Sequence, residues 1–130
     1  MIKLVALLKK RADLTREEFI AHYETCHVPL IMGFFEPFIV EYTRTYLDHE
    51  HPLSFCGGYG GSAVFSGNTY DVVTTQTFRN QQDLDAFYQA AAAAGVGKAI
   101  AADEEKFLDR SASQVLIMLE ENRNPGGKAV

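Results

Sequence analysis

The sequence predicts a single α+β domain, and two observations carry this prediction. The chain has 130 residues, which is the length of one ordinary domain. Four strand-like stretches alternate with two helical patterns in the order β-α-β-β-α-β. This order is typical of the ferredoxin-like arrangement, in which helices cover one face of an antiparallel four-stranded sheet. We therefore expect one domain over residues 1–121, with a Gly-rich loop insert at 49–69 and a flexible tail at 122–130.

The first half of the chain contains a strand and a helix with clear local signals. Residues 2–8 are apolar and β-branched, as in a buried strand. Thr15 followed by Glu18 is a capping box, so a helix should run from Arg16 to about residue 27. Pro29 disfavours helical geometry at Val28. We expect a kink there and a short second helical piece near residues 30–34.

The second half repeats the pattern with a longer helical region. Residues 38–47 and 70–78 read as strands, and alternation within the first of them places Tyr42, Arg44 and Tyr46 on one face. Asn80 is a suitable cap for the next helix, which Gly95 ends. An extra helical segment at 98–109 precedes a fourth strand at 114–120.

The second face of the predicted sheet should not stay exposed to water. Helices cover one face, while the other would carry Val, Tyr and Phe side chains from the strands. Such a surface is too apolar for a monomer of this size. We expect a homodimer in which two sheets pack face to face as a dimeric α+β barrel.

Composition excludes several classes of function. The net charge is -5, and no stretch concentrates Lys and Arg as binding to nucleic acid requires. No apolar run approaches the ~20 residues of a membrane span, and the start of the chain lacks the features of a signal peptide. Cys26 and Cys56 are expected to be free thiols, as in a cytoplasmic protein.

The order and spacing of several motifs resemble those of a known family. The stretch from Leu14 to Phe19 followed by His22-Tyr23, His27, Pro29 and Leu30 is similar to EthD-domain proteins of the dimeric α+β barrel group. The second half agrees, with Tyr70-Asp71 opening a strand that Phe78 closes and Ala102–Asp109 preceding the last strand. The resemblance covers nearly the whole chain apart from the Gly-rich loop and the tail.

The resemblance implies a small-molecule enzyme without a cofactor. The barrel group includes proteins that cyclise, dehydrate, isomerise or decarboxylate small aromatic or polyketide-like organic acids by proton transfer. The EthD association also suggests an oxidoreductase or an auxiliary protein of a monooxygenase-linked degradation pathway. A third possibility is a non-catalytic dimer that binds a small molecule. These three alternatives stay open at the level of sequence.

His27 is the first candidate for an acid or base. It lies on the apolar side of the first helix beside the proline, and a histidine passes protons near neutral pH. The alternative is a core or capping histidine. Tyr23 lies one turn earlier and reaches the same space. Asp71, at the start of a strand, is a candidate because of the family match, although such a residue more often caps a turn.

Substrate contacts are expected from one strand and from the long loop. Tyr42, Arg44 and Tyr46 would hold a phenol or carboxylate, or would instead fill the core or the dimer interface. Phe55 and Tyr59, with Phe65, belong to a segment that is either a lid over the cleft or a mobile insert. These and one further position form the set of candidate substrate-binding residues: Tyr42, Arg44, Tyr46, Phe55, Tyr59 and Thr75. Thr75 stands at a position where the family often has a glutamate.

No metal or nucleotide is expected. His49 and His51 would face the same way on an extended segment, but no third ligand cluster accompanies them. The glycines at 57–61 do not follow the first strand, and the GxGxxG pattern is absent.

Overall fold

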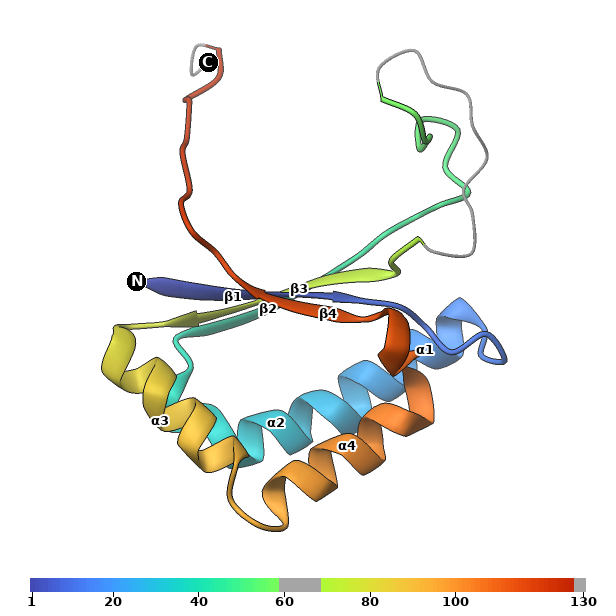
Figure 1. The fold of residues 1–130 in the computed structure, drawn as a ribbon. Helices are drawn as coiled ribbons and strands as arrows, with labels where there is room; N and C mark the ends of the chain where they lie inside the picture. Colours follow the sequence, from blue (N-terminus) through green and yellow to red (C-terminus); the bar gives the residue numbers. More distant parts are fainter. Residues whose placement is uncertain (59–68, 128–130) are drawn as a thin grey trace.

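A computed structural model describes residues 1–58 and 69–127 of the chain. Four strands and four α-helices follow one another in the order that the sequence predicts, with the second helical region divided in two (Figure 1). Their bounds are β1 Ile2–Leu8, α1 Arg16–His22, α2 Val28–Phe35, β2 Glu41–Tyr46, β3 Val72–Phe78, α3 Gln81–Ala91, α4 Val96–Phe107 and β4 Gln114–Ile117.

The four strands form one antiparallel sheet in the order β2-β3-β1-β4. All four helices lie on the same side of this sheet (Figure 1). The predicted α+β, ferredoxin-like fold is therefore confirmed.

The start of α1 has the capping box that the sequence predicts. The Glu18 amide donates to the Thr15 hydroxyl at 3.1 Å, and the Thr15 amide donates to the Glu18 carboxylate at 2.9 Å. Both backbone donors would otherwise be unsatisfied at the helix end.

The helix continues past Pro29, and the expected kink is replaced by a π-helical turn over Tyr23–His27. The Val28 amide bonds the carbonyl of Tyr23, five residues earlier, instead of the carbonyl four residues earlier. Pro29 has no N–H to donate, and its ring would clash with the carbonyl four residues before it in a regular helix. The wider turn precedes Pro29 directly, and α1, the π-helical turn and α2 form one continuous helix.

Several boundaries differ from the sequence prediction. Residues Glu36–Phe38 form a 3₁₀ turn because Pro37 suits the first turn of a helix, so β2 begins at Glu41. The α4 helix ends at Phe107, since Leu108 is extended and pairs with Lys10. The fourth strand ends at Ile117.

The core lies between the sheet and the helices. Strand residues of even number, among them Leu4, Thr74 and Phe78, are buried on this face. Phe19 and Phe107 from the helices are fully buried against them. Tyr42 and Tyr46 also point to this side, since Tyr42 pairs with Gln76 in the sheet. The expectation of tyrosine and phenylalanine on the uncovered face was therefore wrong, because strand alternation sends them to the helices.

The uncovered face carries smaller side chains. Val5 lies between Thr75 of β3 and Leu116 of β4, and Thr43 of β2 is the next neighbour. Residues 47–58 after β2 and the described residues after β4 both extend away from the sheet on this side (Figure 1). Within the described ranges, no helix has the length and apolar character needed to cross a bilayer.

Candidate functional site

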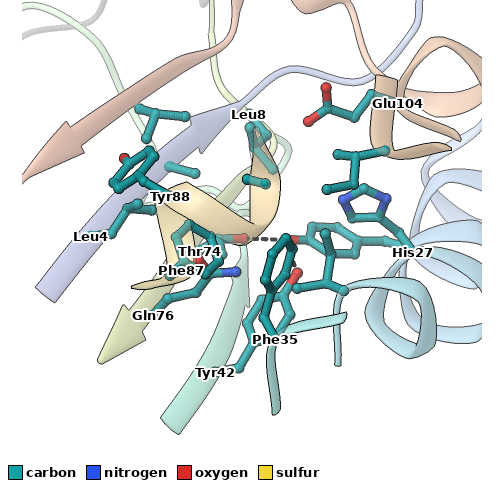
Figure 2. Close-up of a pocket in the computed structure, with 16 residues that line it drawn as sticks. Leu4, Leu8, His27, Phe35, Tyr42, Thr74, Gln76, Phe87, Tyr88 and Glu104 are labelled. Carbon is teal, nitrogen blue, oxygen red and sulfur yellow. Dashed lines mark hydrogen bonds between the residues drawn. The ribbon is translucent and has the colours of Figure 1, made fainter. Parts of the chain in front are cut away.

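A cavity of about 210 Å³ lies between the sheet and helices α2, α3 and α4 (Figure 2). Its walls are mainly aliphatic and aromatic side chains. A small set of polar residues faces it: Tyr23, His27, Tyr42, Thr74, Gln76 and Glu104. An apolar pocket with a few convergent polar groups is the usual form of a small-molecule site.

His27 is held in the cavity wall by a carboxylate from another helix. Its Nδ1 lies 2.8 Å from one oxygen of Asp103 in α4. The other oxygen of Asp103 lies 3.0 Å from Nε2 of His22. His27 is 5% exposed and Asp103 is 9% exposed, so this carboxylate is satisfied by two imidazoles away from bulk water.

The contact with Asp103 determines which nitrogen of His27 is available. A carboxylate only accepts hydrogen bonds, so in the neutral ring the proton belongs on Nδ1 and the lone pair on Nε2. No hydrogen bond to that Nε2 is formed within the described part of the chain. Figure 2 shows the ring on the cavity wall, on the same side as Glu104. The geometry is that of an oriented base facing an apolar space.

Three hydroxyl groups form a chain across the base of the cavity. The Tyr23 hydroxyl lies 2.6 Å from that of Thr74 and 3.0 Å from that of Tyr42. Burial raises the pKa of both tyrosines, although hydrogen bonds to Thr74 and Tyr42 partly offset this rise in pKa for Tyr23. These phenols therefore stay protonated and act as hydrogen-bonding groups.

Arg44 and Tyr46 are engaged outside the cavity. The Arg44 guanidinium donates to both oxygens of Glu24 at 2.9 and 2.6 Å, and the Tyr46 hydroxyl donates to the same carboxylate. The hydrogen bond from Arg44 is the main reason that the pKa of Glu24 is lowered. Of the three strand residues predicted to contact substrate, the structure brings only Tyr42 to the cavity.

Four other predicted residues lie away from this cavity or cannot be placed. Asp71 accepts a hydrogen bond from the Lys10 amide at 2.7 Å and lines a separate polar cleft. Phe55 is 46% exposed in the long loop. Thr75 faces the uncovered side of the sheet. Tyr59, like Phe65, falls outside the described residues.

Glu104 is the second ionisable group on the cavity wall. Burial raises the pKa of its carboxyl group, while the charges of His27 and Arg110 act in the opposite direction. The Arg110 Nε lies 3.4 Å away and the Glu104 side chain is 29% exposed. This carboxyl group therefore takes up a proton more readily than an exposed glutamate.

Gln76 brings a primary amide into the same apolar surroundings. It is 7% exposed and lies between Leu4 and Tyr42 in the sheet. No described group bonds its amide, and no dashed line reaches it in Figure 2. A buried amide without a partner costs about 1–3 kcal/mol.

Sequence reasoning missed five residues of the site: His22, Thr74, Gln76, Asp103 and Glu104. His22 and His27 are five residues apart, which in a regular α-helix places them about 140° apart around the axis. The π-helical turn brings both rings to Asp103. A usable signal was present, because Asp103 shares the buried stripe of α4 with Phe107, four residues later.

Metal ligands do not gather in the described ranges 1–58 and 69–127, where no three His, Cys, Asp or Glu residues could hold an ion. His49 Nε2 bonds the carbonyl of Tyr70, and Nδ1 of His51 accepts from the Leu53 amide.

The profile of the EthD domain matches residues 11–111, which is most of the chain. The chain belongs to the EthD-domain family. A solved EthD family protein from Bacillus halodurans C-125 has a TM-score of 0.59 and is 22% identical to this chain. The match covers 93% of this chain and 99% of the Bacillus protein. A protein from Arabidopsis thaliana has a TM-score of 0.59 at 12% identity, and the match covers 96% of this chain and 100% of the Arabidopsis protein.

HapK from Hahella chejuensis is a further structural neighbour, with a TM-score of 0.55, 9% identity, and coverage of 97% of this chain and 100% of that one. At these identities the likeness shows a shared fold. No curated protein matches the sequence. The resemblance drawn from the motifs is thus confirmed at the level of the family.

The raised pKa of Glu104 predicts a pH-dependent effect of Glu104→Gln on stability. A carboxyl group with a raised folded-state pKa contributes stability below its unfolded pKa and loses that contribution as pH rises through the folded value. Chemical denaturation of Glu104→Gln should therefore show its stability rising relative to the wild type between acidic and neutral pH. The matched control is Glu105→Gln, whose side chain is 69% exposed. A constant difference between Glu104→Gln and wild type across this range would contradict the assignment.

Proposed function

We propose that this EthD-domain protein transfers a proton without a cofactor, using His27 as the acid or base on a small molecule bound in the cavity. The observation that carries the proposal is the contact of 2.8 Å between His27 and Asp103 on the wall of an apolar cavity. A positioned histidine of this kind typically accelerates proton transfer by ~10²–10⁴-fold.

His27 and Asp103 have distinct roles in this proposal. Nε2 of His27 takes a proton from the substrate, and the ring becomes an imidazolium. Asp103 keeps the ring in the required tautomer and stabilises its positive charge, while His22 occupies the second oxygen of the carboxylate. The same ring then returns the proton at a different atom. Cyclisation, dehydration, isomerisation and decarboxylation all contain such steps, and each stays a prediction.

The residues of the cavity wall indicate which of the expected small organic molecules would bind best. Its aromatic and aliphatic lining suits an aromatic or polyketide-like skeleton. Among the described lining residues none is Lys or Arg, and Glu104 adds negative charge when ionised. Arg44, the expected partner of a substrate carboxylate, is held by Glu24. These features favour a neutral carbonyl or phenolic compound over a carboxylate ion. The oxidative role stays a prediction.

Exchange of hydrogen for deuterium in acetophenone tests the role of His27. The wild-type protein should accelerate exchange of the hydrogens next to the carbonyl in D₂O, as followed by NMR. His27→Gln should lower this rate by about 10²–10⁴-fold, because glutamine does not exchange protons near neutral pH. The matched control is His51→Gln, an exposed histidine in the long loop, which should keep the wild-type rate.

Full exchange activity in His27→Gln would show that His27 has a structural role only. Binding of acetophenone without exchange by the wild type would instead support a non-catalytic binding protein.

We further propose that a second copy of the chain covers the open face of the sheet. Val5, Val73 and Leu116 give this face an apolar centre, and Leu116 is half exposed. Residues 47–58 and the described residues after β4 extend past the same face, where a partner would lie between them (Figure 1). A second sheet would bury this surface.

Sedimentation at micromolar concentration tests this dimer. The wild type should sediment at about twice 14.5 kDa. Val5→Arg should produce a folded monomer, because it places an unpaired charge at the centre of the interface. Ala102→Arg, on the exposed side of α4, is the control and should remain dimeric. A wild-type protein that is monomeric would overturn the proposal.

A further inference from the structure

The amide of Gln76 is the one polar group on the cavity wall whose side chain is more than nine-tenths buried and lacks a partner in the described structure. Thr74, two residues earlier on the same strand, is bonded to Tyr23. His27, on the opposite wall, is bonded to Asp103. These polar side chains are satisfied within the protein, and Gln76 is not.

The Gln76 amide remains accessible from the cavity. No fully enclosed side-chain nitrogen or oxygen in the described ranges is without a hydrogen bond, so the unpartnered amide must retain some open surface. Figure 2 shows the side chain among the cavity residues, between Thr74 and Tyr42. Leu4, Phe35 and Phe87 provide the apolar surroundings. An amide kept in such a place is well suited to a polar atom of a ligand.

The position of Gln76 relative to His27 suggests which atom it binds. Both residues line one small cavity, so a ligand that fills it touches both. The amide carries two N–H donors, and Nε2 of His27 carries the lone pair. A ligand that uses both groups would place a carbonyl oxygen at the Gln76 amide and an adjacent C–H bond at the histidine.

We propose that Gln76 binds the carbonyl oxygen of an enolisable ketone substrate and directs the adjacent C–H bond toward His27. The inference rests on the proposed proton transfer and adds the substrate class. Nε2 takes the proton, and the electron pair of the C–H bond forms the carbon–carbon double bond of an enolate. The carbonyl electrons move to the oxygen, where the Gln76 N–H stabilises the negative charge. Return of the proton to carbon or oxygen restores His27.

Binding of two probes of similar shape tests this role without any turnover. Acetophenone carries the carbonyl and ethylbenzene does not. Gln76→Leu should weaken the binding of acetophenone by about five- to tenfold, as measured by ligand-observed NMR, and should leave ethylbenzene unchanged or tighter. Gln89→Leu, on the exposed side of α3, should retain the wild-type preference. The inference would be overturned if the wild type and Gln76→Leu preferred acetophenone over ethylbenzene equally, or if the wild type bound both probes equally well.

The ligand-free protein offers a measurement that needs no probe. Gln76→Leu should raise the melting temperature, because it replaces an unpartnered amide with an apolar side chain of similar size. A lower melting temperature would show that the amide has a structural partner, and would overturn the inference.

These results separate the inference from the proposed function. If Gln76→Leu loses the carbonyl preference but the wild type does not exchange acetophenone hydrogens, carbonyl recognition stands and proton transfer fails. If His27→Gln abolishes exchange while Gln76→Leu binds both probes as the wild type does, proton transfer stands and the role of Gln76 fails.

Discussion

The carboxylate of Asp103 is the constraint on which the site depends. It joins α4 to the long N-terminal helix through His27 at 2.8 Å and His22 at 3.0 Å. A carboxylate this far from water must be satisfied by hydrogen bonds, and removing one partner of such a buried group costs about 3–5 kcal/mol. Phe107 packs against both imidazole rings, with centroid distances of 4.9 Å. The pairing therefore fixes the docking of two helices as well as the orientation and tautomer of His27.

The fold was predictable from the sequence because its signals are local. The capping box at Thr15 and all four predicted strands are present in the structure, although the strand ends differ by a few residues. The π-helical turn was not predictable in the same way. Pro29 marks a disturbance. The sequence predicted a kink and a short second helical piece, whereas the chain widens one turn and keeps the helix continuous. Only this widened turn brings His22 and His27 to one carboxylate.

The candidate site was only partly predictable, since its residues meet through tertiary packing. His27, Tyr23 and Tyr42 do face the cavity, as their helix and strand positions indicated. Thr75 faces the other side of the sheet because strand residues alternate, and its neighbour Gln76 takes the cavity position. Arg44 was expected to hold a substrate carboxylate, but its guanidinium is bonded to the carboxylate of Glu24. Partners such as these lie far along the chain or on another element, so spacing within one element does not predict them.

Asp103 holds His27 with a proton on Nδ1 and a free lone pair on Nε2. The most direct test is ¹⁵N NMR of the histidine ring nitrogens at a pH where the ring is neutral, with the His27 signals assigned by comparison with His27→Gln. We expect Nδ1 of His27 to carry the proton in the wild type and this preference to be lost in Asp103→Asn. A wild-type ring protonated at Nε2 would contradict it.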